Sequence, residues 1–236
     1  MSTSVAPPTI HPENAILPPD PAIAKRVARL LLDIKAVNFR SDPPFIFTSG
    51  KASPVYTDCR KIISFPKVRS ELCDLGAARI RATGAAFDAV AGGETAGIPF
   101  AAWISERLDS PMLYIRKQPK GFGRGAQIEG DFADGAKLVL VEDLATDAGS
   151  KVNFVNAIRK AGAAVDLAFV VFYYGIFPEA QTTLAGLGVQ LLYLTSWPDV
   201  LTVAEEGHDF APDVLRDVRA YLAAPNAWSA AHGGKA

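Results

Sequence analysis

The sequence is poor in cysteine and histidine. Only Cys59 and Cys73 occur, too few and too poorly spaced for a disulfide framework or a zinc site, which favours reduced thiols in a cytosolic protein. The only histidines are His11, His208 and His232, two of them near the chain ends. A mechanism that relies on a Ser–His or Cys–His pair therefore has poor material.

Neither sign of charge dominates, and no long apolar run is present. The 24 basic and 25 acidic residues give a net charge of −1, unlike the basic footprint of a nucleic-acid-binding protein. No segment approaches the roughly 20 apolar residues of a membrane-spanning helix. Residues 1–21 are rich in proline and lack the basic start and apolar stretch of a targeting signal. We expect a cytoplasmic protein with a mobile tail over 1–21 and neither a nucleic-acid nor a membrane partner.

Alternating helices and strands predict the fold. The 236 residues, 49% of them hydrophobic, fit one large α/β domain, expected over 22–228, followed by a frayed end at 229–236. Strands are predicted at 87–91, 112–115, 137–141, 167–173 and 189–194, with helices at 97–108, 149–161 and 178–187. Outside this part we expect helices from Asp20–Pro21, after Pro66, near 197–206 and at 211–223. Two short strands at 45–48 and 54–58, joined by a Ser-Gly-Lys turn, are expected to form a hairpin. Continuous aliphatic strands separated by helices indicate a parallel sheet covered on both faces.

Ligands of such sheets bind beyond the carboxyl ends of the strands. Three segments directly follow predicted strands, namely 92–97, 116–125 and 142–150. The third carries the most chemistry, because a buried strand there runs into Glu142 and Asp143 and then into a loop of small and hydroxyl residues that opens a helix. Backbone N–H groups at such a helix start form a cradle for a phosphate. No Gly-Lys-Ser/Thr follows, so this is not a Walker loop.

An aliphatic strand, two acids and a hydroxyl-rich loop in this order resemble the phosphoribosyl diphosphate signature of the type I phosphoribosyltransferases. The resemblance implies an α/β fold with a central parallel twisted sheet flanked by helices and a small hood formed by N-terminal and C-terminal segments. Glu142 and Asp143 would hold the ribose hydroxyls. The phosphate loop would comprise Leu144, Ala145, Thr146, Asp147, Ala148, Gly149 and Ser150. Ala145 stands where a larger aliphatic is common, and Asp147 puts a negative side chain into an anion-binding loop.

A basic, glycine-rich segment at 114–130 points to one family within this class. Its Arg-Lys pair, later lysine and Gln-Ile-Glu-Gly ending resemble the catalytic loop of orotate phosphoribosyltransferases. By that resemblance Arg116, Lys117 and Lys120 would contact the diphosphate. The catalytic residues would be Lys120, Glu142 and Asp143. The 116–125 loop would reach into the site of a neighbouring subunit, which implies a homodimer. Phe122 replaces a histidine that the family often carries.

Two further blocks resemble the same family. Residues 47–60 resemble the orotate-recognition segment, in which the backbone at Tyr56 and Thr57, with Thr146, would contact the base; Thr48 stands where some relatives have lysine. Residues 91–99 resemble the diphosphate loop. Thr95 and Ala96 replace a Tyr-Lys pair of some relatives there, so diphosphate binding would rely more on backbone donors. Tyr174 stands where some relatives place an orotate-contacting arginine.

The implied reaction transfers the phosphoribosyl group from phosphoribosyl diphosphate to orotate with Mg²⁺, which the substrate and water would mainly hold, without a dedicated protein cage. Three alternatives remain open on the residues alone: a phosphoribosyltransferase for another base, a regulator that senses phosphoribosyl diphosphate, and a noncatalytic nucleotide-binding subunit.

Overall fold

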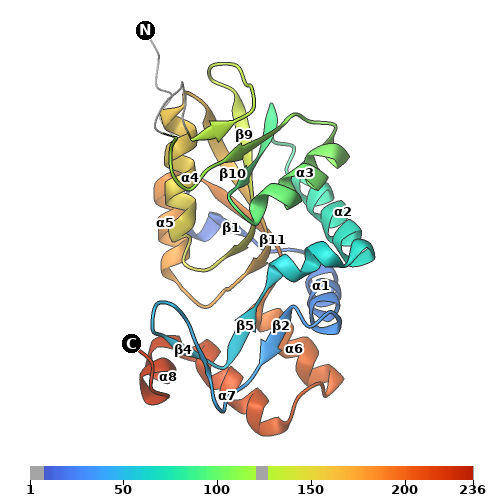
Figure 1. Ribbon diagram of the computed structural model, residues 1–236, viewed down its shortest axis with the longest axis vertical. Helices are drawn as coiled ribbons and strands as arrows, with labels where there is room; N and C mark the ends of the chain where they lie inside the picture. Colours follow the sequence, from blue (N-terminus) through green and yellow to red (C-terminus); the bar gives the residue numbers. More distant parts are fainter. Residues whose placement is uncertain (1–7, 121–126, 236) are drawn as a thin grey trace.

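A seven-stranded sheet forms the centre of the computed structural model, which describes residues 8–120 and 127–235 (Figure 1). Residues 121–125 of the predicted catalytic loop, Phe122 among them, and residues 1–7 of the predicted tail lie outside the described residues. The strand order is β1 (Ile16–Leu17), β11 (Gln190–Ser196), β10 (Ala164–Tyr173), β9 (Lys137–Ala145), β6 (Ala89–Gly93), β7 (Met112–Ile115) and β8 (Ile128–Glu129). All neighbouring strands are parallel except β7 and β8. The predicted α/β fold with a mostly parallel sheet is confirmed.

Helices cover both faces of this sheet (Figure 1). One face carries α1 (Pro21–Asp33), α2 (Pro66–Ala82) and α3 (Gly97–Leu108), and the other carries α4 (Gly149–Lys160) and α5 (Glu179–Leu187). Two separate buried clusters lie on the two sides of the sheet. Helix α1 begins where the sequence predicts, because Asp20 accepts a 2.8 Å hydrogen bond from the amide of Ala22 and Pro21 needs no donor in the first turn.

A second layer, which we call the hood, consists of residues 37–57 and 197–235. Strand β2 (Val37–Phe39) pairs with β5 (Val55–Thr57), and β3 (Phe45–Ile46) pairs with β4 (Ala52–Ser53), in both cases antiparallel. Helices α6 (Trp197–Gly207), α7 (Pro212–Ala223) and α8 (Pro225–Ala231) complete it. The two ends of the hood are joined by a 2.9 Å hydrogen bond from the amide of Ala52 to Ser229 Oγ.

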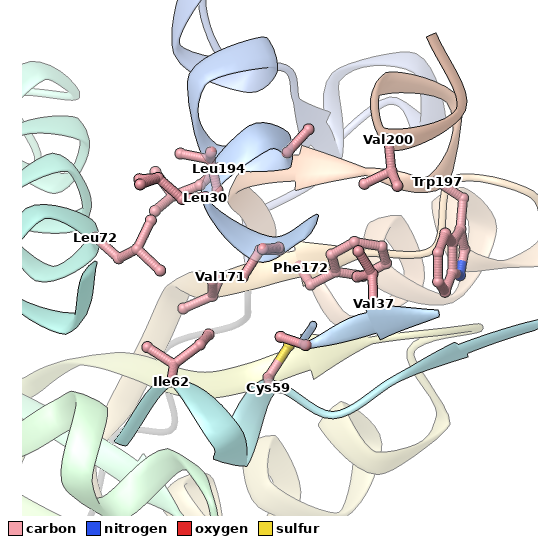
Figure 2. Close-up of a cluster of buried hydrophobic side chains, with 14 of the residues drawn as sticks. Leu30, Val37, Cys59, Ile62, Leu72, Val171, Phe172, Leu194, Trp197 and Val200 are labelled. Carbon is pink, nitrogen blue, oxygen red and sulfur yellow. The ribbon is translucent and has the colours of Figure 1, made fainter. Parts of the chain in front are cut away.

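An apolar cluster fixes the hood to the sheet. The Trp197 ring packs edge-on against Phe172 of β10, with ring centroids 4.9 Å apart, and lies 5.9 Å from Phe39 of β2. Figure 2 shows Phe172 and Val37 beside Trp197, with Leu30 and Leu72 contributed from α1 and α2. Because interiors are close-packed, this cluster holds the hood in one position relative to the carboxyl ends of the strands.

Three local predictions differ from the structure. The 54–58 strand pairs with 37–39 rather than with the 45–48 strand, whose partner is β4. Within the predicted tail, Ile16 and Leu17 form β1 against β11, because the exposed edge of β11 offers unpaired backbone groups. Near the predicted frayed end, α8 covers Pro225–Ala231, and Trp228 and Ser229 are buried.

Candidate active site

The carboxyl end of β9 delivers two acids to the site. Strand β9 extends to Ala145, four residues beyond its predicted end, so Glu142 and Asp143 belong to the strand rather than to the loop. Helix α4 begins at Gly149, as predicted. Ala148, immediately before it, adopts the left-handed conformation, with φ 68° and ψ 9°, and is buried. This backbone reversal turns the chain from the strand into the helix within a few residues.

Asp147 lies against the start of α4. Its Oδ1 accepts a 3.0 Å hydrogen bond from the amide of Gly149 and a 3.1 Å bond from the Thr146 hydroxyl. The amide of Gly149 is the main cause that holds the pKa of Asp147 below its ordinary value. The negative side chain in the predicted phosphate cradle therefore lies one residue before the N-cap, Ala148, and uses one of the cradle donors.

A cavity of about 430 Å³, which we call the acidic cavity, lies beside the two acids. Most of its lining comes from the carboxyl ends of β6 and β9 and from the segments after β6, β7 and β9, which are neighbours in the sheet. Six of its lining residues were predicted as substrate-binding: Thr95, Lys117, Glu142, Asp143, Leu144 and Ser150. The 94–95 segment contains a cis peptide bond, and Glu94 Oε2 accepts a 2.7 Å hydrogen bond from the amide of Lys117.

Burial sets the electrostatics of the acid pair. Glu142 is buried and Asp143 half-buried, and burial is the main cause that raises the pKa of each carboxyl above its ordinary value. Lys151 opposes the increase for both acids. The pair therefore presents carboxylates that are poorly solvated, which makes them strong acceptors for hydroxyl donors.

A second cavity of about 730 Å³, which we call the hood cavity, lies between the hood and the loops of the sheet. Thr146, Asp147 and Tyr174 line it from the sheet side, and Tyr56 and Lys51 line it from the hood. The Lys51 ammonium donates a 2.6 Å hydrogen bond to the Asn226 side chain. Polar and aromatic groups on both walls suit a flat polar ring.

Two predicted loop cations line neither cavity. Lys120 forms an ion pair with Glu129 of β8, and Arg116 lies 3.4 Å from the same carboxylate oxygen. Among the remaining predicted residues, Thr57 and Ala145 are buried. The described residues that line the two cavities do not include Thr57, Ala145, Ala148 or Gly149. The structure thus brings the acids, Thr95, Lys117 and Ser150 together, and leaves Lys120 and Arg116 outside.

Three charged residues escaped the sequence reasoning. Arg60, in the 3₁₀ helix Cys59–Ser64, lines both cavities, which are therefore neighbours. Glu129 binds the loop cations. Lys151 is fully buried beside Glu142. Only Lys151 left a signal, since it falls on the stripe of α4 that also contains Phe154, Val155 and Ile158 and is otherwise apolar.

The fold and the acidic cavity at the carboxyl ends of the central strands define a type I phosphoribosyltransferase. No protein-family model matches the chain. The chain is 52% identical to the orotate phosphoribosyltransferase of Rhizobium rhizogenes over 91% of its own length and 93% of that protein, and 53% identical to that of Agrobacterium fabrum over 90% and 92%. The chain belongs to the orotate phosphoribosyltransferase family.

Solved structures agree with this assignment. The orotate phosphoribosyltransferase from Aeropyrum pernix superposes with a TM-score of 0.64 at 30% identity, over 78% of this chain and 99% of that one. The UMP synthase of Leishmania donovani gives a TM-score of 0.71 at 27% identity, over 84% of this chain but only 42% of that longer chain.

Proposed function

We propose that the chain transfers the 5-phosphoribosyl group from phosphoribosyl diphosphate to orotate, giving orotidine 5′-monophosphate and diphosphate, as a step of pyrimidine nucleotide synthesis in the cytoplasm. The observation that carries the proposal is the pair of neighbouring cavities that Arg60 lines. One is acidic and lies at the carboxyl ends of the strands, and the other is polar and aromatic. In a family whose relatives are named for this reaction, these cavities suit a sugar and a base, respectively.

The acidic cavity would hold the sugar. Glu142 and Asp143 accept hydrogen bonds from the ribose hydroxyls, and the amides of the 144–150 loop, with Ser150, bind the 5-phosphate. As the bond between C1 and the diphosphate oxygen breaks, positive charge builds on the ribose ring. Carboxylates close to the ring stabilise that charge. Binding also holds the two substrates in the orientation that the reaction requires.

The hood cavity would hold orotate. Thr146 and the backbone at Tyr56 and Thr57 contact the pyrimidine, whose N1 forms the new bond to C1. Orotate is already an anion, so the reaction requires little from a protein base. Arg60 and Lys51 supply positive charge around this cavity for the orotate carboxylate.

The departing diphosphate collects negative charge, which the cations at 116–120 and the backbone near Thr95 would balance. Among the described residues, no three acidic, histidine or cysteine side chains gather in a way that could hold a metal ion. We propose that Mg²⁺ is bound mainly by diphosphate oxygens and water, as this cation commonly is at phosphate-containing substrates. Bound in this way, Mg²⁺ would neutralise charge on the leaving diphosphate.

We also infer a homodimer in which Lys120 of the 116–125 loop acts in the site of the neighbouring subunit. This proposal is supported by the position of Lys120 on Glu129, outside the acidic cavity of its own subunit. None of the described helices combines the length and apolar character needed to cross a bilayer. We propose small-molecule substrates only, and neither a nucleic-acid nor a membrane partner.

An absorbance assay tests the reaction directly. The purified chain, phosphoribosyl diphosphate and Mg²⁺ should consume orotate and release diphosphate in equal amounts. Turnover of uracil or hypoxanthine in place of orotate would replace the proposal with a phosphoribosyltransferase for another base. Binding of phosphoribosyl diphosphate without turnover of any base would favour a sensor or a noncatalytic subunit.

A further inference from the structure

Lys151 is a buried charge that the proposed reaction does not yet use. It lies in the first turn of α4, and its side chain is only 1% exposed. A lone ammonium at such a position would be strongly destabilising, so its partners determine its purpose.

Three acceptors surround the Lys151 ammonium, as many as its donors. The Leu144 carbonyl accepts a 2.7 Å hydrogen bond, and the Ser150 hydroxyl lies 3.4 Å away. The third acceptor is Glu142 Oε2, which forms an ion pair with the ammonium. Lys151 is thus satisfied entirely by residues of the proposed sugar-binding segment.

The position of Glu142 depends on this contact. Its side chain is only 9% exposed, and a Cβ at Gly93 would lie 2.9 Å from Glu142 Cγ, so the glycine provides the space. Because Oε2 faces Lys151 and is buried, the other carboxylate oxygen is the one available to the acidic cavity. The ammonium therefore determines which oxygen of Glu142 a sugar can meet.

We propose that Lys151 is a positioning residue that keeps Glu142 ionised and holds one of its oxygens toward the sugar. The proposal rests on the proposed function and adds a residue that does not touch the substrate. Without the ammonium, a buried carboxyl beside Asp143 would take up a proton, and a protonated Glu142 would lose one acceptor and its attraction for a cationic sugar ring.

Lys151 is the cation that acts most strongly on Glu142. Lys117 is the next cation that favours ionisation of Glu142, and it ranks last among the causes that act on its pKa. Asp143 acts in the opposite direction. The remaining charged residues of the acidic cavity are Glu94 and Arg60.

The test uses two substitutions that separate charge from hydrogen bonding. Lys151→Gln removes the charge while its amide can still donate to the Leu144 carbonyl, and Lys151→Met removes both. The measurement is kcat/KM for phosphoribosyl diphosphate across about pH 5 to 9, the range in which a displaced carboxyl pKa becomes visible. Lys160→Met, on an exposed position of the same helix, is the matched control.

Both Lys151 variants should lower kcat/KM at pH 7 by about tenfold to a hundredfold, as losses around an active-site charge generally do. The acid limb of the profile should move up by about one pH unit or more, so that raising the pH recovers part of the loss. Lys160→Met should follow the wild-type profile. Variants that lose activity equally at every pH would overturn the proposal, because loosening of the loop alone predicts that result.

A second experiment introduces Lys151→Met into a Glu142→Gln background. It tests the role of Lys151 even if Lys151→Met alone fails to fold. A neutral pair of similar volume is generally tolerated where a buried ion pair stood. Adding Lys151→Met to Glu142→Gln should cost less than about threefold, since no charge remains to be maintained. A further loss as large as in the wild-type background would reject the role. If the wild-type chain never consumes orotate, the proposed function fails instead, which is a distinct result.

Discussion

The carboxylate of Asp147 accepts a 3.0 Å hydrogen bond from the amide of Gly149, the first residue of α4. This bond has two effects. It satisfies the amide of the first residue of α4, and it occupies one donor of the loop that we propose for the 5-phosphate. A substrate phosphate must therefore compete with a fixed negative charge at the same helix start.

Removing that charge should strengthen phosphate binding and weaken the helix. For Asp147→Ala we expect ribose 5-phosphate to bind about threefold to tenfold more tightly, because repulsion and competition for the amide both disappear. The free energy of unfolding should fall by about 1 kcal/mol through loss of the hydrogen bond to the amide of Gly149. Titration calorimetry and denaturant unfolding measure the two effects. Asp213→Ala, in the first turn of α7, is the control, and unchanged or weaker binding by Asp147→Ala would contradict the competition.

Lys120 should matter for turnover and not for stability. Lys120 forms a partly exposed ion pair with Glu129. Exposed ion pairs contribute about 0–1 kcal/mol to the free energy of unfolding. Lys120→Ala should therefore unfold at nearly the wild-type temperature while kcat falls about a hundredfold to a thousandfold, as after loss of a group that stabilises transition-state charge. Lys160→Ala should leave kcat unchanged. A normal kcat in Lys120→Ala would remove this residue from the reaction.

The regular part of the molecule could be predicted from the sequence because local patterns determine it. Aliphatic runs and helical spacing placed α3 at Gly97–Leu108 and β7 at Met112–Ile115, as found. The partner of 54–58 could not be predicted, since pairing with 37–39 depends on how the hood folds over Phe172 and Trp197. The alternation of apolar and polar residues in a short strand predicts which of its faces is buried, but not which strand it pairs with.

The candidate site was predictable where its residues are contiguous and missed where they come together from distant segments. Glu142 and Asp143 stand at the end of one strand and Ser150 shortly after it, so a contiguous motif revealed them. Arg60 lies more than eighty positions away in sequence and reaches the same cavity through the fold. The orientation of Lys120 toward Glu129 likewise depends on side-chain contacts that no spacing rule contains.

Sharing of the site between subunits can be tested by mixing two inactive variants. Lys120→Ala lacks the loop cation and Asp143→Asn lacks an acid, so a mixed dimer would contain one site with both intact. After subunit exchange, activity should recover to about a quarter of wild type, the share expected from random pairing with one restored site per mixed dimer. Exchange should be verified with differently tagged subunits. No recovery in a verified mixed population would place Lys120 in its own subunit's site.

Asp143→Asn alone should make the protein more stable as well as inactive. Burial raises the pKa of Asp143 in the folded chain, so unfolding releases a proton between the ordinary pKa of 3.8 and the raised value. Wild-type stability is consequently lost as the pH rises through that window. The asparagine variant avoids this loss, and at neutral pH its free energy of unfolding should be higher by about 1 kcal/mol. Urea unfolding at about pH 4 and pH 7 should show the difference growing with pH, and an equal difference at both would contradict burial as the cause.

The conformation of Ala148 can be tested by comparing alanine-to-glycine substitutions at Ala148 and at Ala157. Ala148 is buried with φ 68°, whereas Ala157 is nearly buried in the interior of α4. Both changes remove a methyl group and loosen the unfolded chain, which together cost about 1–2 kcal/mol. Only at Ala148 does glycine also relieve a left-handed backbone, a gain of about 1–2 kcal/mol. The free energy of unfolding of Ala148→Gly should therefore lie within about 0.5 kcal/mol of the wild-type value, and that of Ala157→Gly should be about 2 kcal/mol lower. Equal losses at the two positions would mean that the turn from β9 into α4 is not made at Ala148.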